Sequence, residues 1–304
     1  MGNINSNQEI IENSKILINV GDCTKCKACV NDCVPRLFYF KDDRLQIANN
    51  FEEDCIECGH CVAICPVNVI QLKTRPLDGV KDLPAKEKGI TYDSLYNLVQ
   101  TRRSIRQFKE KPVPKETIEK ILELSRHSPT GSNTENVHYT VVKNPELLIK
   151  FSEALTKNVS EFIKKYEDPE GFISLKALLG EKMLRIVGEQ LDSFKRILLG
   201  IKVGIEFWHW NTEIIIIHAP KETTSTLVED CSLAACHIML AAETLGLATC
   251  SLGYATSLLN QFSSVSELVK IPKGHVVGYT LSIGYSNVKY HRIPARKPVR
   301  VKWL

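Results

Sequence analysis

The sequence predicts an α+β protein with two domains, and three features of the chain support that prediction. A duplicated cysteine pattern lies within the first 75 of the 304 residues. Residues 76–90 combine prolines, glycines and mixed charges, which is the composition of a linker. Residues 91–304 then alternate helical periodicities with short β-branched runs. We therefore expect a small domain over residues 1–75, a linker over 76–90 and a larger α+β domain over 91–304.

Eight of the eleven cysteines form two copies of the spacing C-x2-C-x2-C-x3-C. Zinc sites and disulfides are the alternatives, but zinc prefers four close ligands in two pairs and disulfides need an oxidising compartment. Three cysteines on one tight loop suit three irons of a cubane cluster instead. The first copy is Cys23, Cys26, Cys29 and Cys33, and the second, displaced by 32 residues, is Cys55, Cys58, Cys61 and Cys65.

This pattern resembles the bacterial-type ferredoxins, which carry two 4Fe–4S clusters. The resemblance implies that the fourth cysteine of each copy ligates the other cluster. The expected ligand sets are Cys23, Cys26, Cys29 and Cys65 for one cluster, and Cys55, Cys58, Cys61 and Cys33 for the other. The clusters would also stabilise a domain that is too small to be held by its core alone.

Composition excludes several classes of function. The chain is 43% hydrophobic and 24% charged, as in ordinary globular proteins, and the basic excess behind its net charge of +4 lies in residues 76–304. No nucleic-acid-binding motif accompanies that charge, and no apolar run of about 18 residues predicts a membrane span. The first residues lack a signal-peptide pattern, and iron–sulfur thiolates need a reducing environment, so we expect a cytoplasmic protein.

Hydrophobic patterning predicts the main elements. In the small domain it favours strands at 16–20 and 69–72. In the larger domain Thr91 and Pro114 mark two helix starts, and Gly246 ends a helix that is apolar nearly all round and therefore buried in the core or in a subunit interface. The predicted elements of the larger domain are helices from 91 and 114, a strand at 139–142, a helical segment at 145–205 broken near 169–171, a strand at 214–217, a helix at 226–245 and a strand at 276–283.

Two basic clusters, one around Arg102 and one around Arg296, could converge on a phosphate, although solvated surface is the alternative interpretation. The remaining cysteines, Cys231, Cys236 and Cys250, lack ligand spacing, and we expect them to be buried and inert. Five short motifs follow one another in this part of the chain: Arg102-Arg103-Ser104-x-Arg106, Pro129-Thr130-Gly131-Ser132-Asn133, Leu245 to Gly253, Ser282 to Tyr285, and Arg296-Lys297-Pro298.

Together these motifs resemble the nitroreductase family of FMN flavoproteins over residues 90–304, in the branch that carries a fused ferredoxin. The resemblance implies an α+β fold in a homodimer with FMN at its interface, and a helical segment at 145–205 that covers the flavin. It also implies the contacts of the flavin. Arg102, Arg103, Ser104, Arg296 and Lys297 would hold the phosphate and ribityl chain, Arg106 would lie near the pyrimidine, Pro129, Thr130, Gly131 and Asn133 would reach the flavin of the other subunit, and Leu252 and Gly253 would lie along the isoalloxazine.

The function expected from both parts is that of an FMN-dependent oxidoreductase fed through its own clusters. A ferredoxin is the expected electron donor, with NAD(P)H as a further possibility, and nitroaromatics, quinones or activated alkenes are the acceptors that the resemblance implies. No catalytic side chain is identified, as suits a protein that positions a redox cofactor. A non-catalytic electron-transfer hub and a redox sensor remain as alternatives.

Overall fold

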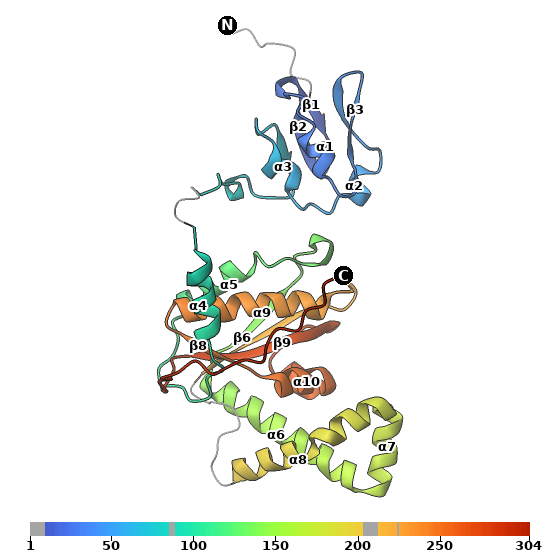
Figure 1. Ribbon diagram of the computed structural model, residues 1–304. Coiled ribbons are helices and arrows are strands. Elements are labelled where there is room, and N and C mark those ends of the chain that lie inside the picture. Colours follow the sequence, from blue (N-terminus) through green and yellow to red (C-terminus); the bar gives the residue numbers. More distant parts are fainter. Residues whose placement is uncertain (1–9, 85–88, 203–211, 224) are drawn as a thin grey trace. The chain divides into compact units, whose positions relative to one another are not determined.

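The computed structural model describes residues 10–84, 89–202, 212–223 and 225–304 (Figure 1). The chain divides into two compact units. One comprises Met1–Gly89 together with Ser132–Thr134, and the other comprises Ile90–Gly131 and Glu135–Leu304. Each unit has its own sheet and core.

The N-terminal unit contains an antiparallel sheet of strand order β1-β2-β5. Its strands are β1 (Ile10–Glu12), β2 (Ile16–Asn19) and β5 (Ile70–Leu72). Ile16 lies opposite Leu72 and Ile18 opposite Ile70, so this pairing joins the two ends of the duplicated region. Strands β2 and β5 confirm the predicted ones, whereas β1 is not predicted.

A hairpin of β3 (Phe38–Lys41) and β4 (Arg44–Ile47) lies between the two cysteine copies and is not predicted either. Its turn residues Asp42 and Asp43 both have positive φ, as tight hairpin turns require. Short helices follow the same duplication: α1 (Ala28–Asp32) and α3 (His60–Ile64) each begin within a cysteine loop, and α2 (Phe51–Asp54) precedes the second loop. The core beneath them includes the buried Leu37, Leu45 and Phe51.

The C-terminal unit contains a four-stranded antiparallel sheet of order β6-β7-β9-β8. The strands are β6 (His138–Val142), β7 (Glu213–Pro220), β8 (Ala248–Ser251) and β9 (His275–Gly284). The isoleucine run of β7 is buried on both faces, as its unbroken β-branched sequence predicts. The predicted strands at 139–142, 214–217 and 276–283 are confirmed, and β8 is an addition.

Helices cover both faces of this sheet. Ile215 and Ile217 pack with α5 (Lys115–Ser125) and α9 (Leu227–Thr244), whereas Ile214 and Ile216 pack with α6 (Pro145–Glu167), α10 (Gly253–Gln261) and α11 (Ser263–Leu268). The period-two alternation of β7 therefore supplies both cores. Helix α4 (Tyr92–Thr101) begins at Thr91, whose hydroxyl accepts a hydrogen bond from the Ser94 N–H at 3.2 Å and confirms the predicted cap.

Helices α6, α7 (Pro169–Leu179) and α8 (Glu181–Lys202) form the predicted helical segment, whose residues 203–205 lie outside the described part of the chain. The break is at Asp168, whose carboxylate accepts from the Gly171 N–H at 2.7 Å and caps α7. Helix α6 buries Phe151 and Leu155 on the α10 side of the sheet. That the segment covers a flavin stays a prediction. Within the described ranges, no helix is long and apolar enough to cross a membrane.

Candidate functional site

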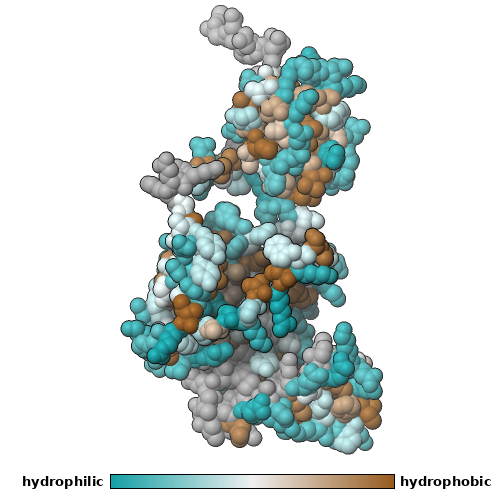
Figure 2. All heavy atoms as spheres, in the orientation of Figure 1, coloured by the Kyte–Doolittle hydropathy of each residue, from teal (hydrophilic) through white to brown (hydrophobic). Residues whose placement is uncertain are grey.

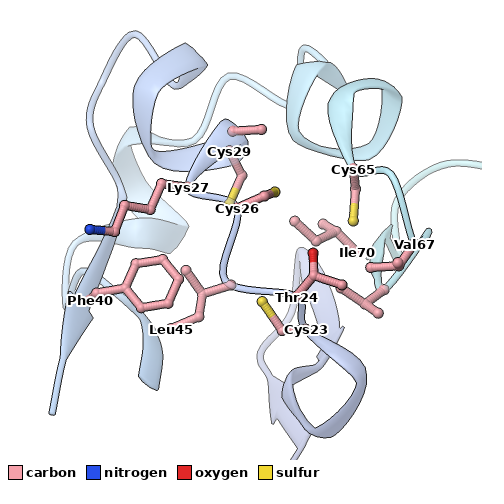
Figure 3. Close-up of a pocket in the computed structure, with 12 residues that line it drawn as sticks. Cys23, Thr24, Cys26, Lys27, Cys29, Phe40, Leu45, Cys65, Val67 and Ile70 are labelled. Atoms are coloured by element: carbon pink, nitrogen blue, oxygen red, sulfur yellow. The ribbon is translucent and has the colours of Figure 1, made fainter. Parts of the chain in front are cut away.

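The N-terminal unit contains a cavity with about 320 Å³ of empty space, into which four thiol groups from both cysteine copies project (Figure 3). Cys23, Cys26 and Cys29 come from the first loop, and Cys65 comes from the end of α3. Lys27 and the apolar side chains of Phe40, Leu45 and Ile70 complete the wall. The structure thus brings together one of the two cysteine sets expected from the ferredoxin pattern.

A second cavity, with about 360 Å³ of empty space, is lined by the other expected set. Glu57 and His60 lie in its wall with the apolar residues Leu37, Phe38 and Phe51. His60 is exposed and its Nδ1 lies 3.1 Å from the Asp32 carboxylate. The cysteines of this cavity are Cys55, Cys58, Cys61 and Cys33.

The chemistry of both cavities fits an iron–sulfur cluster. All eight cysteines are free thiols. Burial, reinforced by neighbouring thiolates, raises the pKa of Cys29 to about 11 and that of Cys61 to about 12. Coordination to iron would stabilise the thiolate forms that burial disfavours, so four thiols around one cavity suit a cluster, and its binding would contribute to folding.

In the C-terminal unit the Arg102–Arg106 segment lies along the edge strand β8. Ser104 forms a parallel bridge with Thr249, and the Ile105 N–H donates to the Thr249 carbonyl at 3.0 Å. Burial raises the pKa of the Cys250 thiol on β8, and the nearby guanidinium groups of Arg106 and Arg102 partly offset that rise, so both groups lie near this strand. Arg103 and Ser104 are half-buried beside them.

Beyond β8 the chain turns into α10 at Leu252 and Gly253. The Leu252 N–H donates to the Thr280 carbonyl at 2.8 Å, which fixes this turn on β9. A Cβ at Gly253 would have no neighbouring atom within 4 Å, so the space above its backbone is open. Cations along β8 and an open backbone surface at its end are features that fit the phosphate and the ring system of a flavin.

The second predicted loop, Pro129 to Gly131, is held by α9. The buried carboxylate of Asp230 accepts a hydrogen bond from the Gly131 N–H at 3.0 Å. Nearby, the Ser128 hydroxyl lies 2.5 Å from Nδ1 of His237 and donates to the Ser125 carbonyl at 2.7 Å. Thr130 braces the loop by accepting from the Glu135 N–H at 3.0 Å. Neither Asp230 nor His237 is identified from the sequence, because their partners lie about 100 residues away.

The two predicted groups lie at opposite ends of α9 (Figure 1). Burial raises the pKa of the half-buried Glu243 carboxyl near the end of α9, and Arg102 is close enough to offset part of that rise. Asp230 holds the other loop one turn from the helix start. Thirteen residues at 1.5 Å each separate Asp230 from Glu243 by roughly 20 Å. One chain therefore does not bring Pro129–Gly131 next to Arg102–Arg106.

Arg296, Lys297 and Asn133 are the remaining predicted residues, and Asn133 ends the short turn that begins at Gly131. Arg296 and Lys297 are exposed, in a C-terminal segment without regular secondary structure. Asn133, which has φ of +54°, groups with the N-terminal unit.

The expectation that Cys231, Cys236 and Cys250 are all buried is wrong for Cys236, which is exposed. Although α9 is apolar nearly all round, only one side of it packs on the sheet. Val228 and Leu233 are exposed with Cys236 on the remaining surface. The apolar sequence of this helix predicts burial in the core or in a subunit interface. The core of one chain covers only part of the surface of α9.

Comparison with known proteins places these observations in a family. The nitroreductase family model matches residues 99–285, and a 4Fe–4S dicluster domain model matches residues 22–70. A 4-nitrobenzoate reductase from Nocardioides sp. is 25% identical over 240 residues, which are 71% of this chain and 89% of that protein. Nitroreductase NfnB from Mycolicibacterium smegmatis is 26% identical over 178 residues, which are 55% of this chain and 75% of that protein. A nitroreductase from Desulfitobacterium hafniense, crystallised with FMN, is 21% identical and superimposes with a TM-score of 0.49. The match covers 69% of this chain and 97% of that one.

Fold and cysteine pattern together define a ferredoxin-type 4Fe–4S domain followed by an α+β domain. The chain belongs to the nitroreductase family, because the family model matches more than half of it. The suspected combination of the two domains is thereby confirmed.

Proposed function

We propose that this chain is an FMN-dependent oxidoreductase that receives electrons through two 4Fe–4S clusters and reduces a small acceptor. The observation that carries the proposal is the presence, in one nitroreductase-family chain, of two cavities that each gather four cysteines. Two metal sites built to store and pass single electrons have no evident use in a chain that takes electrons only as hydride from a nicotinamide.

The residues along β8 would hold the flavin. Arg102, Arg103 and Ser104 offer cationic and hydroxyl groups to the phosphate and ribityl chain, and Arg106 offers a cation to the pyrimidine edge. Leu252 and the open backbone at Gly253 leave room for the ring system. When bound, FMN supplies the ability to accept electrons singly and to deliver them in pairs. These residues would bind the flavin and set its electrostatic environment.

A second copy of the chain would complete each flavin site. The separation of Pro129–Gly131 from Arg102–Arg106 along α9 supports this arrangement, because a partner can supply the distant group. Helix α4 buries none of its residues and exposes Leu95, Tyr96 and Val99. Figure 2 shows hydrophobic atoms interrupting the hydrophilic surface of the C-terminal unit on the face where α9 and the C-terminal segment lie. Such patches are typical of subunit interfaces.

Residues 289–304, which carry Arg296 and Lys297, would contribute to the dimer and to the flavin phosphate site, and deleting them tests this role. Every residue of this segment is exposed, so its loss removes little packing within one protomer. We expect the shortened chain to fold, to run as a monomer in analytical ultracentrifugation and to lose FMN. A shortened chain that stays dimeric with full FMN content would contradict this role of the tail.

Nitroaromatics, quinones and activated alkenes are the proposed acceptor class, and one relative is named as a 4-nitrobenzoate reductase. The test is anaerobic stopped-flow on the full chain after iron, sulfide and FMN have been counted. Reduced ferredoxin, NADH and NADPH are compared as donors, and 4-nitrobenzoate is the acceptor. We expect ferredoxin to reduce the clusters and the flavin, and the acceptor to reoxidise both. Cluster reduction that never reaches a bound flavin would refute the proposal.

A further inference from the structure

The two cysteine loops have the same backbone but different charges. Lys25 and Glu57 occupy equivalent positions, 32 residues apart, and have φ of +59° and +53°. Lys27 and Gly59 form the next equivalent pair, both in the left-handed region with φ of +62° and +74°. The first loop therefore carries two lysines where the second carries a glutamate and a glycine.

The charges that line the cavities differ in the same direction. Lys27 lies in the wall of the Cys23 cavity, with its ammonium group 6.0 Å from the centre of the Phe40 ring. Glu57 lies in the wall of the Cys55 cavity, where the Lys15 ammonium group approaches it to 3.6 Å and the Thr74 hydroxyl donates to it at 2.6 Å. Lys25 is paired with Asp43 and so contributes less than Lys27. Once these ion pairs are counted, Lys27 leaves a net positive charge at the first cavity, whereas Lys15 and Glu57 cancel at the second.

The hydrogen bonds to sulfur are matched between the two sets, whereas burial differs at one position, since Cys29 is buried and its counterpart Cys61 is partly exposed. A backbone N–H approaches a thiol at 3.4 Å in each set, from Lys25 to Cys23 and from Leu37 to Cys33. The middle cysteine of each loop, Cys26 or Cys58, is exposed in both. Cluster potential depends on net charge, hydrogen bonds to sulfur and solvent exposure. The burial of Cys29 would disfavour the more negative reduced state at the first site, so charge is the term that favours reduction there.

We infer that the two cluster sites are unequal, with the site of Cys23, Cys26, Cys29 and Cys65 holding the electron in the half-reduced domain. A cation beside a cluster stabilises its reduced, more negative state. One electron therefore leaves the Cys55 site, which is oxidised, and reduces the Cys23 site. The inference rests on the proposed occupancy by two clusters, but not on the flavin or on the acceptor. We expect a preference of at least about tenfold, which is about 59 mV for a one-electron couple.

The test is an EPR-monitored redox titration of the anaerobically prepared full chain in three variants. Lys27→Gln removes the cation at the first cavity. Gly59→Lys adds one at the equivalent position, where a side chain meets no atom within 4 Å and where Lys27 already shows that lysine adopts this backbone. Lys73→Gln is the matched control, since this lysine is paired with Glu12 and lines neither cavity.

We expect two separate one-electron steps in the unaltered protein. Lys27→Gln should lower the upper step, Gly59→Lys should raise the lower step, and Lys73→Gln should move neither. Two clusters titrating in a single step, or a Lys27→Gln variant in which only the lower step moves, would overturn the inference. An iron content of about four per chain would overturn the two-cluster occupancy itself, which separates that failure from an error in the order of potentials.

Discussion

The buried carboxylate of Asp230 and the backbone N–H of Gly131 are joined by a 3.0 Å hydrogen bond across 99 residues of sequence. This bond fixes the Pro129–Gly131 loop to the first turn of α9. The loop that we propose to reach a partner's flavin is thus held by the helix whose exposed side suits a subunit interface.

Replacing Asp230 by alanine should therefore loosen the loop. Because the Gly131 N–H loses a charged acceptor, we expect the free energy of unfolding to fall by about 1–3 kcal/mol and FMN affinity to weaken. Urea denaturation and fluorescence titration with FMN measure the two effects. Glu229→Ala, one residue away and exposed, is the control and should change neither. Unchanged FMN affinity in a destabilised Asp230→Ala protein would contradict the positioning role.

The crossed cysteine sets predict a specific pattern of double variants. Cys26 and Cys65 lie in one cavity, whereas Cys26 and Cys33 lie in different cavities. Cys26→Ser with Cys65→Ser should remove one cluster and leave about four irons per chain, and Cys26→Ser with Cys33→Ser should remove both. Anaerobic iron and sulfide analysis gives the answer. The reverse pattern would mean that each cysteine copy binds its own cluster.

Arg102 is expected to contribute directly to FMN binding. Removing a guanidinium group that bonds to phosphate costs about 1.5–3 kcal/mol, so Arg102→Ala should weaken FMN binding by roughly 10- to 100-fold. Isothermal titration of the flavin-free protein measures the change. Arg126→Ala, an exposed arginine paired with Glu123 on α5, is the matched control. Equal affinities of the two variants would remove Arg102 from the site.

A histidine cluster at the end of the large sheet predicts how stability depends on pH. Nδ1 of the buried His218 lies 2.8 Å from Nδ1 of His275, and its Nε2 lies 3.1 Å from the Thr140 hydroxyl. Burial, followed by the nearby His275 and His138, lowers the pKa of His218 to about 4. The unfolded chain then binds a proton more readily, so stability falls as pH falls from about 6.5 towards 4.

As the pH falls from 7 to 5, the lowered pKa of His218 should reduce the free energy of unfolding by about 2 kcal/mol. Urea denaturation followed by tryptophan fluorescence measures the cost, since all three tryptophans lie in residues 208–303. His218→Asn should flatten the pH dependence by a similar amount. An unchanged slope in that variant would assign the acid sensitivity to other groups.

Local patterns of the sequence predict most of the architecture. The Thr91 cap, the isoleucine run of β7 and the cysteine spacing each express a rule that acts within a few residues, and each element is where it is predicted. The β3–β4 hairpin is not predicted, because its Asp42-Asp43 turn contains no glycine or asparagine.

The site is less predictable, because its supports are tertiary. Asp230, His237 and His218 are placed by strand and helix packing over long sequence separations, which no periodicity records. Cys236 shows the same limit, since helical patterning does not tell which part of an all-apolar surface meets the sheet.

The proposed path of electrons through the clusters to the flavin is tested most directly by mixing reduced ferredoxin anaerobically with the FMN-loaded protein and with its Cys26→Ser, Cys33→Ser variant. We expect rapid flavin reduction in the unaltered protein and a rate of flavin reduction at least about 100-fold lower in the variant. NADH serves as a control donor, because a variant that NADH still reduces has an intact flavin site and lacks only the path through the clusters. Flavin reduction by ferredoxin at equal rates in both proteins would contradict the proposed path.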